Sequence, residues 1–490
     1  MSLAATPIAF DNSYARQLDG FYVPWQPARA PDPQLLYLNQ PLADELGLRL
    51  QGLDLAAVFS GNQLPEGATP IAQAYAGHQF GRFSPQLGDG RALLLGEVLD
   101  RHGHRRDIAF KGSGRTPFSR GGDGKAAVGP MLREVLVGEA MHALGIPSTR
   151  ALAVVATGEP VMREQVLPGA LLTRVAASHL RVGTFQYFAA RGEPERVRQL
   201  AEYAIARHDP ALAADPDRWY GLLRAMAQRQ AALIAQWMNV GFIHGVMNTD
   251  NMTLSGETID YGPCAFMEGY ERGAVFSSID HGGRYAYANQ PLIARWNIAR
   301  LAETLLPLLG DDDDAAVARA TEVVDAFPAW YEAQLLQGQR AKLGLATAEA
   351  GDAELAAAFL VLLEQQQVDF TLAWRRLADA AAGQAQPLRE LFTDPAALAP
   401  WLDRWHTRCA AEGGDAAARA AAMRLVNPIV IPRNHRVEEA LAAAGEGDLL
   451  PFQRLLSALQ RPYEEDLEDS RYAQPAAREV TACYKTFCGT

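Results

Sequence analysis

Four oxygen-bearing side chains lie in two neighbouring loops of the segment 241–264, GFIHGVMNTDNMTLSGETIDYGPC. They are Asn248, Asp250 and Asn251 in the first loop and Asp260 in the second. Short strands are predicted at 252–254 and 257–259, joined by a turn in which Gly256 can take a positive φ. This hairpin would bring the two loops together. Carboxylate and amide oxygens suit Mg²⁺ that is held jointly with substrate phosphates, so the segment predicts a metal site.

The order of these residues is that of the metal-binding half of a protein-kinase site, where H-R-D-L-x-x-x-N precedes a hairpin and D-F-G. His244 takes the place of the histidine, Asn251 that of the asparagine, and residues 260–262 that of D-F-G. The position of the catalytic aspartate holds Val246, which cannot accept a proton. Asp250 is the nearest carboxylate that could replace it. An ordinary hairpin with solvated polar loops is the alternative interpretation.

A segment rich in Gly and Arg, residues 76–125, carries candidates for phosphate binding. Strands are predicted at 91–99 and 107–111, and the second ends at Lys111. Glycines let the backbone approach phosphates closely, and a lysine supplies a point charge. The turn before the first strand contains Gly88, Gly90 and Arg91, and the loop after the second contains Arg115, Arg120, Asp123, Gly124 and Lys125. A plain tight turn and a surface lysine are the alternatives for these features.

Three further charged residues could complete this site. A helix is predicted at 130–144, with Pro130 in its first turn, and Glu134 on it could form an ion pair with the strand lysine. Glu139 is the competing candidate on the same helix. Arg174, on a predicted strand, and Arg181, in the loop after it, could form a bidentate phosphate clamp. Taken singly, each could be an ordinary surface charge.

The rest of the chain reads as scaffold. Residues 149–156 and 161–166 are predicted to form a hairpin around Gly158, and residues 195–239 are predicted to be helical. The acidic run 311–314 is interpreted as a helix N-terminus, where acidic residues are electrostatically favoured. The Ala-rich C-terminal part is predicted to be helical at 292–309, 314–340, 351–381, 386–393, 415–424 and 436–458.

Composition narrows the class of protein. The chain has 490 residues with 49% hydrophobic content, enough for a large core, and its net charge is −12. An acidic chain argues against a general nucleic-acid or membrane-surface binder. It has no run of 18 apolar residues and no evident secretory signal. Four cysteines indicate a reducing compartment, so we predict a cytoplasmic protein. We expect it to be a monomer, although the sequence does not determine its oligomeric state.

Long motifs in these segments resemble the selenoprotein O family, which includes the bacterial YdiU proteins. They are YAGHQFGRFSPQLGDGRA, DIAFKGSGRTPFSRGGDGKA, HGVMNTDNM and DYGPCAFM, and the likeness covers nearly the whole chain. The resemblance implies an α+β, protein-kinase-like fold with two lobes. We therefore expect an N-terminal extension at 1–75, a nucleotide-binding small lobe at 76–180, and a large, mainly helical lobe at 181–490.

The resemblance also implies an activity: ATP binds in a flipped orientation, and AMP is transferred to Ser, Thr or Tyr hydroxyls of protein substrates. Attack at the α-phosphorus makes diphosphate the leaving group, which cations must stabilise. Arg174 and Arg181 would hold the terminal phosphate, and Glu134 would position Lys111. The remaining residues that would contact ATP are Gly88, Gly90, Arg91, Asp123 and Gly124.

By the same resemblance, Asn251 and Asp260 would bind Mg²⁺ or Mn²⁺, and Asp250 would be the catalytic base. Cys488 stands where some members of the family carry selenocysteine, and we expect it to form a reversible disulfide with Cys483, with Cys264 or with a target protein. Two alternatives to adenylyl transfer remain. They are a protein kinase that uses Asp250, and a non-catalytic ATP-binding scaffold.

Overall fold

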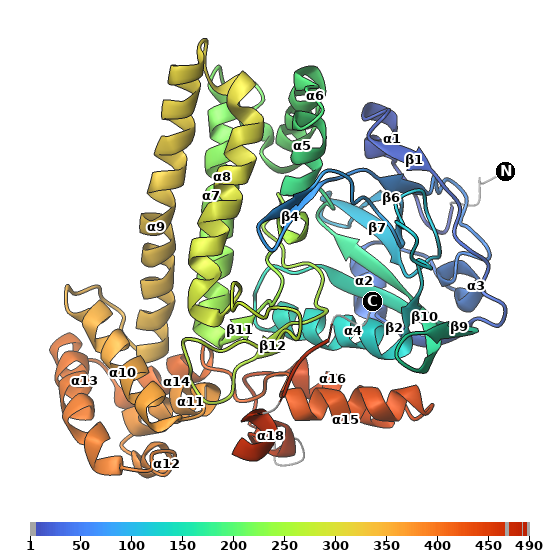
Figure 1. Cartoon of the computed structure of the whole chain (residues 1–490). Helices are drawn as coiled ribbons and strands as arrows, with labels where there is room; N and C mark the ends of the chain where they lie inside the picture. Colours follow the sequence, from blue (N-terminus) through green and yellow to red (C-terminus); the bar gives the residue numbers. More distant parts are fainter. Residues whose placement is uncertain (1–5, 466–469, 483, 488–490) are drawn as a thin grey trace.

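The computed structural model describes residues 6–465, 470–482 and 484–487. An antiparallel sheet from the first 176 residues lies on one side of the molecule, and three long helices stand beside it (Figure 1). Shorter C-terminal helices cover the base of both (Figure 1). None of the helices within the described residues is long and apolar enough to cross a membrane.

The main sheet has eight strands in the order β1-β3-β6-β7-β10-β9-β2, with β8 paired to β10. Their bounds are β1 Tyr22–Pro24, β2 Gln34–Leu38, β3 Ile71–Gln73, β6 Ala92–Leu99, β7 Arg105–Lys111, β8 Ala126–Ala127, β9 Arg150–Met162 and β10 Val166–Ala176. Two small ribbons lie apart from it: β4 Gly77–Gln79 with β5 Arg82–Ser84, and β11 Phe242–Ile243 with β12 Ala265–Phe266. The strands predicted at 91–99 and 107–111 are therefore the central pair β6 and β7. The segment expected as an extension, 1–75, contributes β1, β2 and β3, so the sheet crosses residue 75.

The helices account for most of the remaining chain. Their bounds are α1 Ser13–Gln17, α2 Gln40–Glu45, α3 Leu55–Phe59, α4 Val128–Ala143, α5 Val182–Ala189, α6 Pro194–His208, α7 Arg218–Val240, α8 Gln290–Leu309, α9 Asp313–Leu343, α10 Asp352–Gln366, α11 Phe370–Ala381, α12 Gln386–Arg389, α13 Ala399–Glu412, α14 Ala416–Arg424, α15 Asn434–Gly445, α16 Leu450–Leu459, α17 Ser470–Ala473 and α18 Arg478–Ala482. Short 3₁₀ turns occur at Pro210–Leu212, Thr249–Asn251, Tyr287–Asn289 and Pro395–Leu398. Asp312 caps α9 by accepting a hydrogen bond from the Ala315 N–H, which confirms the capping interpretation of the acidic run.

Two predicted hairpins are wrong. β9 continues through Gly158, and the turn to β10 lies at 163–165. Gly158 is needed for a close approach instead, because a Cβ there would come within 2.5 Å of the Asp32 side chain. The segments 252–254 and 257–259 do not pair with each other; Thr253 bridges to Arg181 and Thr258 bridges to Ser148. Each segment thus finds its backbone partners elsewhere in the fold.

Several predicted helices are interrupted. The 195–239 helix breaks between α6 and α7 at Pro210, the 351–381 helix breaks at Gln367, and the 436–458 helix breaks at Gly447. Gln367 and Gly447 both adopt positive φ, and Pro at an interior helix position cannot donate to the ladder. The helix α13 was missed altogether.

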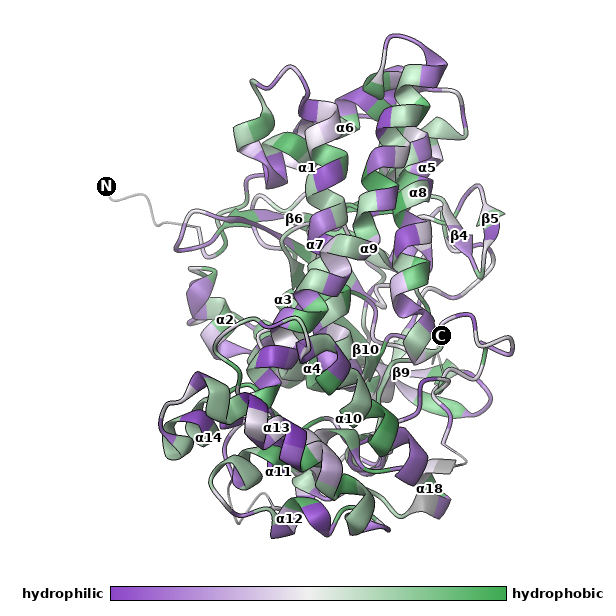
Figure 2. Cartoon of the chain, turned by 90° about the vertical axis from the view of Figure 1, so that its left-hand side faces the viewer, coloured by the Kyte–Doolittle hydropathy of each residue, from purple (hydrophilic) through white to green (hydrophobic). Residues whose placement is uncertain are grey.

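Packing of α7 against α8 and α9 forms the largest core. Figure 2 shows apolar and polar residues in bands along these helices, as expected when one side of each is buried. The apolar stripe of α7 is buried, from Trp219 to Trp237, and Gly241 ends the helix in a left-handed conformation. This helix fixes the start of the loop at 244–251. A second contact, between α4 and the pair α15 and α16, supports the sheet from below.

Candidate active site

A pocket of about 520 Å³ lies between the sheet and the loops that follow α7. The residues that the resemblance assigns to ATP, to the metal or to catalysis all line this pocket, whereas Arg115, a further candidate for phosphate binding, does not. The assigned residues are Gly88, Gly90, Arg91, Lys111, Asp123, Gly124, Glu134, Arg174, Arg181, Asp250, Asn251 and Asp260. Segments that are far apart in the sequence thus form one cavity, and the roles of the individual residues remain predictions.

Lys111, at the end of β7, lies between two carboxylates. Its Nζ is 2.6 Å from Oε1 of Glu134 on α4 and 2.5 Å from Oδ1 of Asp260. The same Glu134 oxygen accepts a hydrogen bond from the Tyr261 N–H at 3.1 Å, so α4 also fixes the backbone beside Asp260. The competing candidate Glu139 pairs with Arg150 at 2.6 Å, away from the lysine.

Three cationic side chains in the pocket lie around the carboxylate of Asp260. Its Oδ1 also accepts a hydrogen bond from Arg174 Nη1 at 2.7 Å, and its Oδ2 is 3.9 Å from Arg181 Nη1. Burial alone would raise the pKa of Asp260, but Lys111 and the two arginines hold it well below its usual value. Asp260 also has a left-handed φ of 63°, a conformation that is rare outside glycine and that often occurs at functional sites.

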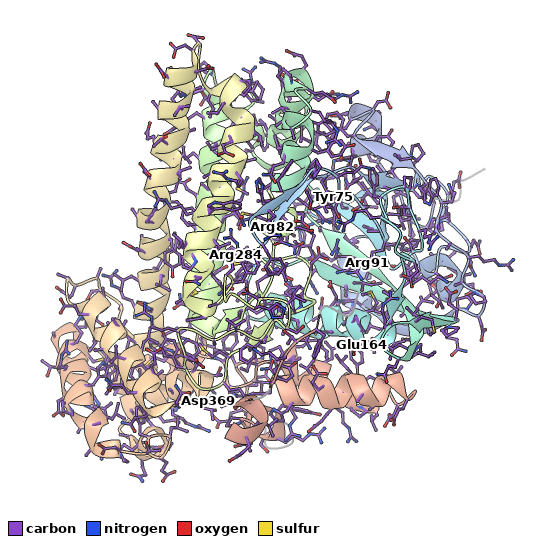
Figure 3. All side chains as sticks on the ribbon, in the orientation of Figure 1. Tyr75, Arg82, Arg91, Glu164, Arg284 and Asp369 are labelled. Atoms are coloured by element: carbon purple, nitrogen blue, oxygen red, sulfur yellow. The ribbon has the colours of Figure 1, made fainter. Side chains whose placement is uncertain are left out.

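Arg181 is held between the sheet and the loop at 244–251. Its guanidinium carbon is 4.4 Å from the centroid of the Tyr75 ring, and its Nη1 donates to the Asp250 carbonyl oxygen at 3.1 Å. Arg181 Nε and Arg91 Nη1 are buried without a hydrogen-bond partner. Tyr75 and Arg91 both lie on the sheet side of the molecule (Figure 3). Buried donors without partners lining a pocket are suited to an anionic ligand.

Asp250 is buried on the 3₁₀ turn Thr249–Asn251. Its Oδ2 accepts a hydrogen bond from Gln79 Nε2 at 3.3 Å, while its Oδ1 has no hydrogen-bond partner and would clash with any Cβ at Gly77. Burial raises the pKa of Asp250 to about 6. A carboxylate with a raised pKa at a pocket wall has the character of a general base.

The other polar residues of this loop are oriented by the scaffold. His244 Nε2 lies 2.9 Å from the Ile259 carbonyl oxygen, which ties the loop to the segment before Asp260. Asn251 donates its Nδ2 to the Val246 carbonyl oxygen at 3.0 Å, which leaves its Oδ1 as an acceptor. One amide oxygen and the carboxylate of Asp260 fit a hard cation that also binds phosphates. Within the described ranges, no group of three or more His, Cys, Asp or Glu side chains could hold a metal by itself.

The glycine positions serve packing as well as the pocket. A Cβ at Gly88 would come within 2.3 Å of the Phe118 ring, and one at Gly124 within 2.1 Å of the Gly114 carbonyl oxygen. The first approach packs the loop after β7 against the turn before β6, and the second folds that loop back on itself. The Asp123 carboxylate pairs with Arg163 at 2.8 Å, so in this structure it stabilises the loop.

Sequence reasoning missed several residues that line the pocket. Tyr75, Gln79 and Phe80 come from the segment around β4, and Asp89 lies between the two predicted glycines. Burial raises the pKa of Asp89 to about 6. The motif YAGHQFGRFS was a signal, because its glycines and aromatics are not typical of a solvated connection, but it received no role.

Cys264 lies just after the Asp260 loop and is buried, and burial raises the pKa of its thiol to about 12. Cys409, on α13, is also a buried free thiol. Cys483 and Cys488 lie outside the described residues, so the predicted disulfide remains a prediction. The nearby Thr486 donates its hydroxyl to the Pro263 carbonyl oxygen at 2.6 Å, which places this part of the C-terminal segment beside the loop.

Known proteins resemble this chain over nearly its whole length. A family model described as "Protein adenylyltransferase SelO" matches residues 5–460. A protein named "Protein nucleotidyltransferase YdiU" from Cereibacter sphaeroides is 63% identical over 484 residues, which cover 98% of this chain and 99% of the relative. Proteins of the same name are 63% identical over 474 residues in Chromobacterium violaceum, covering 96% of this chain and 99% of the relative, and 57% identical over 492 residues in Rhizobium meliloti, covering 99% and 100%. The chain therefore belongs to the SelO family of nucleotidyltransferase enzymes.

Proposed function

We propose that the chain is a protein adenylyltransferase that moves AMP from ATP to Ser, Thr or Tyr hydroxyls. One observation carries the proposal: Lys111, Arg174 and Arg181 converge on Asp260 in a pocket whose wall also holds the buried carboxylate of Asp250. Three cations at one place suit the diphosphate that leaves in adenylyl transfer. The kinase-like fold and the flipped nucleotide are part of this proposal.

In the proposed reaction, a substrate hydroxyl oxygen attacks the α-phosphorus of ATP and its proton passes to Asp250. The new bond joins the hydroxyl oxygen to the α-phosphorus, and the bond from the α-phosphorus to the bridging oxygen of the β-phosphate breaks. Diphosphate departs with the electron pair of that bond, and the arginines with Lys111 stabilise its charge. Val246 takes no part, because a valine side chain cannot accept a proton.

A divalent cation fits the donor set of Asn251 and Asp260. Mg²⁺ or Mn²⁺ there would offset the negative charge of the phosphates. Asp260 contacts Lys111 and Arg174 in this structure, so these cations and the metal ion would share one carboxylate. Asn251 would contribute its amide oxygen.

Labelled ATP tests this function against both alternatives. The purified chain is incubated with a heat-inactivated bacterial protein extract and ATP that is labelled at the α or at the γ position. We expect only the α label on protein; the γ label alone would show a kinase, and neither label would show a scaffold.

Variants assign the transfer to this pocket. Asp260→Ala should abolish transfer, and Asp250→Asn should slow it about a hundredfold while ATP binding persists. Asp403→Asn, at an exposed position on α13, is the matched control and should transfer at the parent rate. Unchanged transfer by both pocket variants would overturn the assignment.

A further inference from the structure

We propose that His179 is a positioning residue, which holds the guanidinium of Arg174 ready for the phosphates of ATP. The inference rests on the proposed function, since it gives Arg174 a phosphate to bind. His179 has no place in the sequence motifs described above and does not line the pocket. Its ring contacts the Arg174 guanidinium, and both residues are buried: His179 is 4% exposed and Arg174 is 3% exposed.

Hydrogen bonds fix which nitrogen of His179 faces the arginine. Oδ2 of Asp107 accepts from the His179 backbone N–H at 2.8 Å and lies 2.9 Å from the ring Nδ1. Because Nδ1 donates its proton to the carboxylate, Nε2 presents a lone pair. Arg174 Nε lies 3.3 Å from that Nε2 and donates to it.

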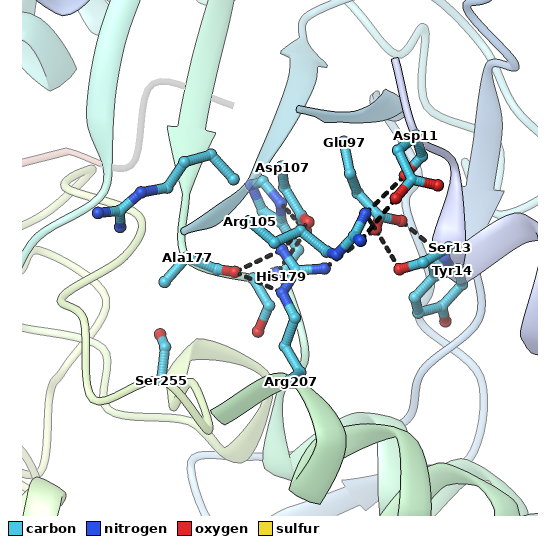
Figure 4. A network of polar contacts seen from close by, with 12 residues as sticks. Asp11, Ser13, Tyr14, Glu97, Arg105, Asp107, Ala177, His179, Arg207 and Ser255 are labelled. Carbon is cyan, nitrogen blue, oxygen red and sulfur yellow. Dashed lines mark hydrogen bonds and ion pairs between the residues drawn. The ribbon is translucent and has the colours of Figure 1, made fainter. Parts of the chain in front are cut away.

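Asp107 is itself held in place, so the ring has a firm support. Arg207 Nη2 lies 2.5 Å from Oδ1 of Asp107, and Arg207 Nη1 lies 3.2 Å from Glu97. Figure 4 shows this network running from the Asp107 and His179 pair through Arg207 to Glu97 and the N-terminal segment at Ser13. The network thus connects strands β6 and β7 and the N-terminal segment to Arg174.

A neutral ring is the right partner for this task. Burial lowers the pKa of His179 to about 4, so the ring carries no charge near neutral pH. A carboxylate at this place would orient Arg174 but would also cancel its charge. The imidazole orients the guanidinium through Nε and leaves its full positive charge for Asp260 and for an incoming phosphate.

The ring also limits how Arg174 can pair with Asp260. Arg174 makes one hydrogen bond to Asp260, from Nη1 at 2.7 Å, while Nε remains on His179. A guanidinium released from the ring could bind both oxygens of the carboxylate in the favoured bidentate geometry. The guanidinium would then be less available to ATP. Loss of His179 should therefore weaken the binding of ATP and leave the binding of AMP unchanged.

Two substitutions at His179 test the contributions of its two ring nitrogens separately. His179→Asn places an amide near Nδ1 and keeps a partner for Asp107, whereas His179→Gln places an amide oxygen near Nε2 and can still accept from Arg174. Binding of ATP and AMP is measured by calorimetry, and folding by the melting temperature. We expect His179→Asn to weaken ATP about tenfold and AMP by less than about twofold, and His179→Gln to remain closer to the parent.

A double-mutant cycle decides whether the effect passes through Arg174. In an Arg174→Ala background, His179→Asn should weaken ATP binding no further. Three results would overturn the proposal. They are an equal loss of ATP affinity from His179→Asn in both backgrounds, an equal loss of affinity for ATP and AMP, and unchanged ATP binding. If His179→Asn does not fold, a loss of ATP binding in His179→Gln as large as that of Arg174→Ala would also overturn it.

The cycle measures binding without turnover, so it is independent of the labelling experiment. Failure of α-label transfer with an intact cycle would reject the proposed function and keep the positioning role. If the α label is transferred but the two substitutions have additive effects on ATP binding, the proposed function stands and the positioning role is rejected.

Discussion

Glu134 and Glu139 lie on the same helix, are both buried, and each pair with a cation at 2.6 Å. Only Glu134 belongs to the pocket. Substituting each glutamate in turn therefore compares two buried ion pairs, one with Lys111 inside the pocket and one with Arg150 outside it. Removing one partner of a buried pair commonly costs about 3–5 kcal/mol, so both variants should lose stability.

We predict that Glu134→Gln weakens ATP binding about tenfold, because Lys111 then loses one of its two carboxylate contacts and the Tyr261 N–H loses a charged acceptor. Glu139→Gln should lower the melting temperature and keep the parent affinity for ATP. Calorimetric titration of both variants with ATP checks the pair. Equal loss of ATP affinity would show that Glu134 acts only through stability.

The charged residues proposed from their order along the chain lie together in one pocket, and their roles remain predictions. Glu134, the helix carboxylate proposed as the partner of the strand lysine, lies 2.6 Å from it. Tyr75, Gln79 and His179 could not be found in this way. They act through a ring face, an amide and a back-side hydrogen bond, which only the packed structure brings into contact.

Among the elements, the β4–β5 ribbon is the one whose importance was least visible in the sequence. Its two-residue turn, Phe80-Gly81, has positive φ at both positions, as type I′ turns require. The strain at Phe80 is balanced by hydrogen bonds from its N–H to the Asn248 side chain and the Tyr285 hydroxyl, both at 3.1 Å. The ribbon is therefore fastened to the loop that carries Asp250.

Gly77 on β4 offers a steric test of that arrangement. Its φ is not left-handed, but a Cβ would lie 2.6 Å from Oδ1 of Asp250. We predict that Gly77→Ala displaces this carboxylate and slows α-label transfer by up to roughly a hundredfold, while ATP affinity stays near the parent value. Gly282→Ala, where a Cβ would meet nothing within 4 Å, is the control and should behave as the parent. Normal transfer by Gly77→Ala would show that the position of Asp250 is unimportant.

Regular elements were easier to predict than their connections. The apolar stripe of α7 and the strands β6 and β7 follow simple periodicities. The hairpin predicted at 252–259 has suitable turn residues, yet its two halves pair with Arg181 and Ser148. Gly158 likewise resembles a turn residue and instead accommodates Asp32. The local sequence does not predict which residues from distant parts of the chain will pack against a segment.

At the scale of the whole molecule, the last turn of α9 joins the long helices to the C-terminal helices. Lys342 lies there, 4% exposed, with its Nζ 4.9 Å from the Trp374 ring and 5.6 Å from the Phe370 ring. Within the described part of the chain, no carboxylate lies at ion-pair distance from this amine. Burial lowers the pKa of Lys342 to about 7.

This buried amine should make the stability of the chain depend on pH. The unfolded chain keeps the proton up to a pKa near 10.5, whereas the folded chain releases it near 7, so stability falls as the pH drops from 10.5 to 7. Lys342→Met has a similar volume and no charge, and it should raise the free energy of unfolding at pH 7 by roughly 4 kcal/mol. The gain over the parent should shrink as the pH rises toward 10. Urea unfolding across this pH range, with the exposed Arg404→Met as control, measures it; a gain independent of pH would mean that better packing alone stabilises the variant.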